Sequence, residues 1–315
     1  MMNENRCRKI VRTLWISLAL SVAAPAVAQG HGNAEATAVS ATIDQQEWSK
    51  RKQFVTLGNG QRVAYIEAGN PAGPPLLLLH GYTDTNRVWS TMIPTLARYR
   101  LIMPDLRGHG ASEAPPCCYA VPDLAYDAHL LLQELGIEKA YVVGHSLGSF
   151  VAQEMAAAYS RQIEGIVLLA STARLAITAD SDLYNAVAEM NAPLTVDAEF
   201  LDGWMEAGVG PAYGNFARAE AAATPLHVWK GVIYELVGFE AARHARLVTQ
   251  PVLLVSATDD ELFDLPHRTA LSEAYPHAKR VLLENAGHNF PMRMPERTAS
   301  LIDGWILSQS GQDAR

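Results

Sequence analysis

The chain has 315 residues, of which 49% are hydrophobic and 18% are charged. This length and composition favour one large domain with an insertion over two equal domains. The formal net charge is −8 at pH 7, and without its first 28 residues the chain would carry 21 Lys and Arg against 32 Asp and Glu, a net charge of −11. Nucleic-acid binding depends on basic side chains that neutralise phosphates, so we expect no nucleic-acid partner.

Residues 1–28 are predicted to be a signal peptide. A basic run at 5–9 precedes a mostly apolar stretch at 14–28, and Ala26-Val27-Ala28 places small residues at the cleavage positions. Cleavage after this tripeptide would leave a periplasmic or secreted protein with no stable membrane anchor. An uncleaved anchor is the alternative, although the apolar stretch is short for a full span. Residues 29–50 are expected to form a flexible N-terminal segment.

Apolar runs alternate with helical patterns along the rest of the chain. This alternation predicts an α/β fold with a mostly parallel eight-stranded sheet and flanking helices. The strands are expected at 53–57, 62–67, 75–80, 100–104, 140–144, 166–171, 251–256 and 279–284. The helices are expected at 86–98, 121–136, 146–160, 267–275 and 295–308. Gly58-Asn59-Gly60 separates the first two strands, which predicts an antiparallel hairpin at the sheet edge.

The most informative stretch is Gly144-His145-Ser146-Leu147-Gly148, a G-x-S-x-G motif. An apolar run at 140–143 precedes it and a helix-forming segment at 150–156 follows it, which is the strand–turn–helix context of a nucleophile elbow. The turn leaves no room for side chains at its flanking positions, so glycines occupy them. Ser146 is the candidate nucleophile, and a chance match to the short motif is the alternative.

A serine hydroxyl needs a base, and the base needs an orienting acid. His288 follows the apolar run 280–284 and is the candidate base, with a loop-capping histidine as the alternative. The candidate acids, Asp259 and Asp260, follow the strand predicted at 251–256. The alternative is that both aspartates are non-catalytic residues of a solvated turn at the end of that strand.

Backbone donors for an oxyanion are expected where the apolar strand 75–79 ends in His80-Gly81. The N–H groups of Tyr82 and Leu147 would converge on the oxyanion, while His80 is expected to pack the turn. His109 and His145 lie in glycine-rich turns and receive no catalytic role. The histidines show no paired spacing suited to a metal, so neither a metal nor a cofactor is expected.

The adjacent residues Cys117 and Cys118 are predicted to be free thiols. Their Cα atoms lie about 3.8 Å apart across a trans peptide, which is shorter than ordinary disulfide geometry. A strained vicinal disulfide is the alternative.

Taken in order, these motifs resemble the α/β-hydrolase-fold family from about Phe54 to Ile306. The segment 105–112 is similar to the family's D-x-R-G-x-G-x-S turn. The sequence departs from the family pattern at Ser149 and Ala257, where glycine is common, but both residues are small. Esterase and lactonase-type members are the most similar. Epoxide hydrolases and haloalkane dehalogenases share the framework but use an Asp nucleophile, so Ser146 argues against both chemistries.

The resemblance implies an α/β-hydrolase core at 51–172 and 248–315, with a helical cap at 173–247. Aromatic side chains of that insertion, above all Trp204 and Trp229, could line the substrate pocket, and packing of the cap's own core is the alternative. The other aromatic candidates are Tyr213, Phe216 and Tyr234.

In the family pattern the acid lies three residues after a small turn residue. Counting from Ala257 gives Asp260, 28 residues before His288. The expected function is that of an exported serine hydrolase that cleaves a small-molecule carboxylic ester or lactone through an acyl-enzyme. A carbon–carbon bond hydrolase, a cofactor-free perhydrolase (haloperoxidase) and a weakly catalytic binding protein are the alternatives.

Overall fold

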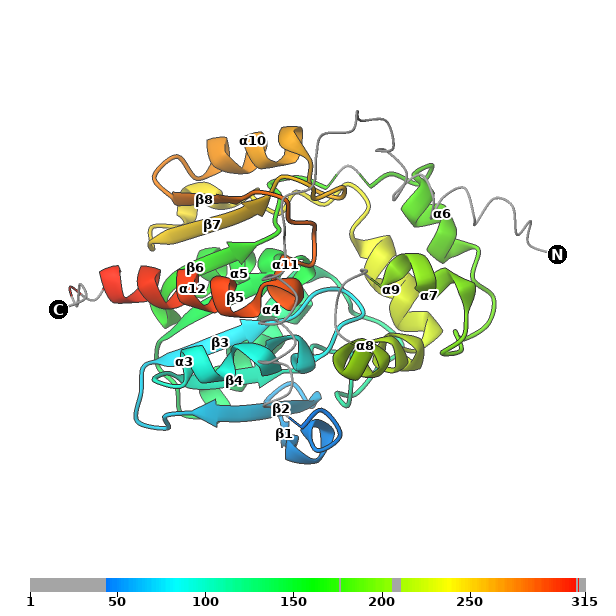
Figure 1. The fold of residues 1–315 in the computed structure, drawn as a ribbon, viewed down its shortest axis with the longest axis horizontal. Coiled ribbons are helices and arrows are strands. Elements are labelled where there is room, and N and C mark those ends of the chain that lie inside the picture. Colours follow the sequence, from blue (N-terminus) through cyan, green and yellow to red (C-terminus); the bar gives the residue numbers. More distant parts are fainter. Residues whose placement is uncertain (1–43, 176, 206–210, 310, 312–315) are drawn as a thin grey trace, which may run out of the picture.

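A single eight-stranded sheet forms the centre of the protein (Figure 1). The computed structural model describes residues 44–175, 177–205, 211–309 and 311. The spatial strand order is β1-β2-β4-β3-β5-β6-β7-β8. The strands are β1 (Gln53–Thr56), β2 (Arg62–Gly69), β3 (Pro75–Leu79), β4 (Arg100–Pro104), β5 (Ala140–His145), β6 (Ile163–Leu169), β7 (Val252–Ala257) and β8 (Lys279–Leu283).

Strand β2 runs antiparallel to both β1 and β4, and all other neighbouring strands are parallel. This arrangement confirms the mostly parallel sheet and the hairpin at its edge. Both faces of the sheet are buried, as β3 shows. Leu77 and Leu79 belong to one apolar cluster, and Leu76 and Leu78 belong to the other. Burial on both faces explains why this strand is a continuous apolar run.

Helices cover the two faces of the sheet separately. Residues of α4 (Val121–Glu134), α5 (Leu147–Ala158) and α10 (Leu265–Ala274) pack into the first cluster. Residues of α3 (Ile93–Leu96), α11 (Phe290–Arg293) and α12 (Pro295–Gln309) pack into the second. In the described part of the chain, no helix is long and apolar enough to cross a membrane.

The single helix predicted at 86–98 is wrong. A 3₁₀ helix, Asn86–Met92, is followed by the short α3, in which Pro94 stands in the first turn. Pro94 has no N–H to continue an α-helical ladder. Asn86 is moreover held by partners far away in the chain, because it accepts a hydrogen bond from Trp48 Nε1 at 2.9 Å and its backbone N–H donates to Asp105 at 2.9 Å.

Among the described residues between β6 and β7 there are four α-helices, and we call them the cap. They are α6 (Asp182–Ala188), α7 (Glu199–Trp204), α8 (Pro211–Ala223) and α9 (Leu226–Glu235). In Figure 1 they gather beyond the carboxyl ends of the parallel strands. Leu201, Val228 and Trp229 of the cap belong to the first apolar cluster, so the cap packs directly on the core.

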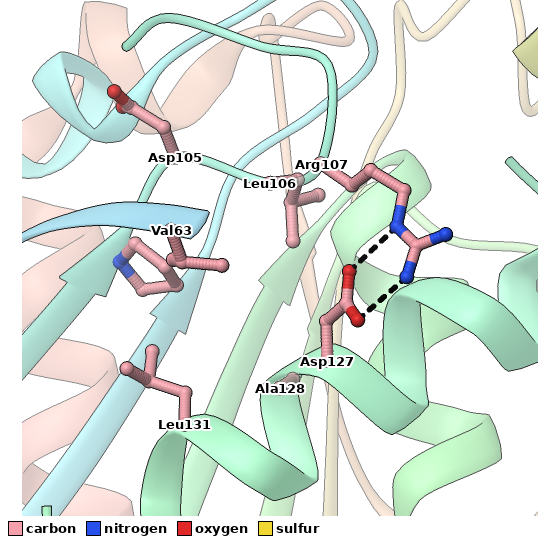
Figure 2. Close-up of a pocket in the computed structure, with 8 residues that line it drawn as sticks. Val63, Asp105, Leu106, Arg107, Asp127, Ala128 and Leu131 are labelled. Carbon is pink, nitrogen blue, oxygen red and sulfur yellow. Dashed lines mark hydrogen bonds and ion pairs between the residues drawn. The ribbon is translucent and has the colours of Figure 1, made fainter. Parts of the chain in front are cut away.

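The turn after β4 is a structural anchor. The buried Asp105 carboxylate pairs with Lys52 at 2.6 Å. Arg107 donates two hydrogen bonds of 2.7 Å to Asp127 on α4, as Figure 2 shows. The small hollow in that figure is lined by Val63, Leu131 and neighbouring residues of this turn and of α4, and none of the candidate catalytic residues lines it.

Candidate active site

Ser146 stands at the sharp turn between β5 and α5. Its backbone has φ 51° and ψ −119°, a conformation that costs a non-glycine residue free energy and persists only where the surrounding structure imposes it. The flanking glycines make the turn possible. A Cβ on Gly144 would lie 2.1 Å from the Gly148 carbonyl oxygen, and a Cβ on Gly148 would lie 2.2 Å from the Leu79 carbonyl oxygen. The sequence therefore folds here as an elbow that presents the Ser146 side chain.

The structure brings together the three side chains that the sequence singles out. Ser146 Oγ lies 2.9 Å from His288 Nε2. His288 Nδ1 lies 3.0 and 3.1 Å from the two carboxylate oxygens of Asp260. The residues arrive from three different strand ends, since Ser146 follows β5, Asp260 follows β7 and His288 follows β8. This arrangement can deprotonate a serine hydroxyl and stabilise the imidazolium that results.

The adjacent aspartates have different surroundings. The Asp260 side chain is 2% exposed and accepts hydrogen bonds from the N–H groups of Leu262 at 3.0 Å and Phe263 at 2.9 Å. Burial by itself raises the pKa of Asp260, but His288 and these N–H donors outweigh it and hold the pKa below its ordinary value. Asp259 is exposed and accepts a hydrogen bond from the Thr258 hydroxyl. The carboxylate that meets His288 is therefore that of Asp260.

The predicted oxyanion donors lie beside the nucleophile. Leu147 is the first residue of α5, so its N–H has no partner within the helix. A Cβ on Gly81 would lie 3.3 Å from Ser146 Cβ, which brings the backbone before Tyr82 against the nucleophile. His80 packs the turn, because its Nε2 accepts a hydrogen bond from the Leu106 N–H at 2.9 Å. Convergence of the Tyr82 and Leu147 N–H groups on a substrate oxygen stays a prediction.

Comparison with known proteins agrees with this fold. The family model for the alpha/beta hydrolase fold matches residues 74–207, which include Ser146. A hydrolase from Pseudomonas aeruginosa PA01 superimposes with a TM-score of 0.72 at 26% identity, over 82% of this chain and 98% of that chain. The esterase RhEst1 from Rhodococcus superimposes with a TM-score of 0.72 at 25% identity, over 82% and 99% of the two chains. Lipase 1 of Psychrobacter immobilis is 26% identical over 81% of this chain and 85% of that protein.

The chain is an α/β-fold hydrolase. Within the residues that the structure describes, no group of three or more His, Cys, Asp or Glu side chains is arranged to hold a metal ion. Cys117 and Cys118 are both exposed and are not joined by a disulfide.

The aromatic residues of the hydrolase's cap fall into different environments. Trp204 is half-buried and its ring contacts those of Tyr82, Phe200 and Trp229, with centroids 5.1–5.7 Å apart. Trp229 is 1% exposed, so it packs inside this cluster rather than presenting a free face. Their contribution to substrate binding stays a prediction.

The remaining aromatic candidates are spread over the cap. Tyr213 is buried, and the Phe216 ring lies under the Arg87 guanidinium. Tyr234 is 44% exposed and contacts Tyr184.

Sequence reasoning missed an acidic group beside the site. The Asp84 side chain is 24% exposed, and its Oδ2 lies 3.9 Å from His145 Nδ1. The pKa of Asp84 is raised to about 7, mainly by burial. Glu220 raises it further, and His288 opposes the shift. The only sequence signal for Asp84 was its position three residues after the His-Gly turn.

Proposed function

We propose that this hydrolase is an exported serine enzyme that cleaves a carboxylic ester or lactone through an acyl-enzyme. The observation that carries the proposal is the continuous hydrogen-bonded series from Ser146 Oγ through His288 to Asp260. A lipase and an esterase stand among the similar proteins, which favours an ester over other acyl compounds. The export part of the proposal rests on the sequence of residues 1–28, which lie outside the described residues.

In the first half of the proposed reaction, Ser146 Oγ attacks the acyl carbon and His288 Nε2 takes the hydroxyl proton. The oxygen that becomes negative accepts hydrogen bonds from the backbone N–H groups of Tyr82 and Leu147. Asp260 accepts the Nδ1–H of His288, which fixes the tautomer and stabilises the imidazolium. His288 then gives its proton to the leaving oxygen, the C–O bond breaks and the acyl group remains on Ser146.

In the second half, a water molecule takes the place of the leaving group. His288 removes one of its protons, and the hydroxide attacks the acyl carbon. The tetrahedral intermediate collapses, Ser146 recovers its proton from His288, and the carboxylic acid leaves. Each proton removed by His288 is returned by it within the same half-reaction, so these steps need no cofactor.

The test is covalent labelling combined with turnover. A fluorophosphonate probe should label the wild-type protein, and Ser146→Ala should abolish labelling and lower turnover by about 10⁴-fold or more. The exposed Ser49 offers the matched control, because Ser49→Ala removes a hydroxyl far from the site in the sequence. Undiminished hydrolysis by Ser146→Ala would contradict the mechanism.

The substrate class is tested on the same preparation. Esters of graded acyl length and a panel of lactones should turn over many times per enzyme. A single slow acylation without recycling would favour the binding-protein alternative. Preferential cleavage of a carbon–carbon bond, or peroxide-dependent activity, would favour the other two alternatives.

A further inference from the structure

The cap holds the loop that carries one of the proposed oxyanion donors. We call residues 81–87 the oxyanion loop. The Tyr82 hydroxyl donates a hydrogen bond to the carbonyl oxygen of Trp229 on α9. Thr83 Oγ1 accepts a hydrogen bond of 2.7 Å from Trp204 Nε1 on α7. Two cap helices therefore contact two consecutive residues of this loop.

The strongest of these connections is made by Glu220 on α8. Its Oε2 accepts a hydrogen bond of 2.7 Å from the Thr85 hydroxyl. Its Oε1 accepts hydrogen bonds of 2.9 and 2.6 Å from Arg87 Nε and Nη2. The Arg87 side chain is 3% exposed, and its Nη1 also donates to the Gln45 carbonyl oxygen at 2.7 Å. This buried ion pair between Arg87 and Glu220 is costly to break, because removing the carboxylate leaves a buried guanidinium without its partner.

The oxyanion loop has a conformation that needs such support. Thr83, directly after the proposed donor Tyr82, has φ +64°. A β-branched residue in this left-handed region is rare and persists only where the surroundings impose it. The cap helices α7, α8 and α9 contact Thr83 itself and residues before and after it, so the cap contributes to this restraint.

We infer that Glu220 is a positioning residue: from its place on the cap helix α8, it holds the oxyanion loop in the conformation that catalysis requires. Turnover therefore depends on how α8 is placed against the loop. The inference rests on the proposed acyl-transfer function. Glu220 does not touch the reacting atoms. It acts through Thr85 and Arg87 on the direction of the Tyr82 N–H, and a small misplacement of a catalytic group is enough to slow the reaction strongly.

The test compares Glu220→Gln with Asp202→Asn. The first keeps the size of the side chain and removes its charge at the loop. The second removes the charge of another cap carboxylate, which pairs with Arg218 at 2.9 Å and is 67% exposed. Glu220→Gln should lower kcat by about 10- to 100-fold with KM within about threefold of wild type, because loss of one oxyanion donor costs about 10²–10³-fold. Asp202→Asn should keep both constants.

A second measurement does not depend on activity. Backbone amide hydrogen exchange in peptides covering residues 81–87 should be faster in Glu220→Gln than in wild type and unchanged in Asp202→Asn. Thr85→Val, which loses a bond to Glu220 and also the acceptor of the Arg87 N–H, should show a change in the same direction, while Thr85→Ser should behave as wild type. If the wild-type chain hydrolyses no ester, the proposed function fails, and the exchange experiment still decides whether Glu220 restrains the loop.

Three outcomes would overturn the inference. The first is a Glu220→Gln variant with wild-type kcat. The second is an exchange rate in 81–87 that stays at the wild-type value. The third is a loss of activity that Asp202→Asn shares and that follows a general fall in Tm, which would assign the effect to the stability of the cap as a whole.

Discussion

The His145 imidazole hydrogen-bonds the backbone carbonyl oxygen of His288, with 3.1 Å between Nε2 and oxygen. The residue before the proposed nucleophile thus holds the segment that carries the proposed base. A carbonyl oxygen only accepts, so His145 Nε2 carries the proton and Nδ1 does not. Burial, together with His288, lowers the pKa of His145 to about 3, which keeps its ring neutral over the working range of a hydrolase.

This contact predicts that His145 positions His288 through its backbone. His145→Leu removes the donor and should lower kcat by about 10- to 100-fold, because the base loses its alignment with Ser146. His145→Gln retains an N–H donor at a similar distance from the backbone and should recover most of the activity. Steady-state kinetics on one ester measures kcat for both variants. His277→Leu, which changes an exposed histidine, is the control. Equal activity of the Leu and Gln variants would show that the hydrogen bond does not matter.

Asp84 predicts a pH-dependent change in stability. Its ordinary pKa is 3.8, and burial raises the value in the folded protein to about 7. Between these two values the folded protein holds a proton that the unfolded chain has lost, so the free energy of unfolding falls as pH rises through this window. Asp84→Asn cannot ionise. Its gain in Tm over wild type should therefore grow from about pH 4 to about pH 7 and stay constant above.

Thermal unfolding of both proteins at pH 4, 5.5, 7 and 8.5 measures this gain. Besides burial, His288 and a hydrogen bond with the Gly81 backbone lower the pKa of Asp84, Glu220 raises it, and His145 lies nearby. A gain that is equal at every pH, or one that shrinks as pH rises, would show that Asp84 is not a raised carboxyl group.

The three side chains brought together at the site could be predicted because local sequence encodes their positions. Ser146, Asp260 and His288 each follow an apolar strand, and parallel strands place their carboxyl ends along one edge of the sheet. The departure at Ser149 also has a local explanation, since its hydroxyl donates to the Ser146 carbonyl oxygen within the same turn.

Features that depend on distant partners could not be predicted from sequence. Asn86 takes its conformation from Trp48, 38 residues away, and not from its own helical pattern. Glu220 meets Arg87 across 133 residues of chain, and no local periodicity marks either of them. Only its residue type makes Trp229 a pocket candidate in the sequence, and its near-complete burial depends on how α9 packs on Tyr82 and Phe200.

The proposed signal peptide at 1–28 predicts that these residues are cleaved off on export. Protein recovered from the periplasm or medium of an exporting host should begin near Gln29, because Ala26 and Ala28 present small residues to the signal peptidase. N-terminal sequencing measures this directly. Ala28→Asp should block cleavage and retain the longer chain. Recovery of soluble cytoplasmic protein with Met1 intact would contradict the prediction.

The adjacent carboxylates Asp259 and Asp260 give the sharpest test of the proposed triad. Asp260 accepts the Nδ1–H of His288 at 3.0 Å, so Asp260→Asn would replace this acceptor by an amide that can stabilise the wrong tautomer. The variant should fold, because an amide oxygen can still accept the N–H groups of Leu262 and Phe263. Its kcat should fall by about 10⁴-fold, as in other triads.

Asp259→Asn is the matched control, since it makes the same change one residue away. Its side chain is exposed and bonded to Thr258, so the expected loss is below about tenfold, the scale of one surface interaction. Both variants should be compared at one pH on one ester, with Tm measured alongside to confirm folding. A larger loss of kcat in Asp259→Asn than in Asp260→Asn would assign the acid to Asp259. The hydrogen bonds between Asp260 and His288 would then have no role in catalysis.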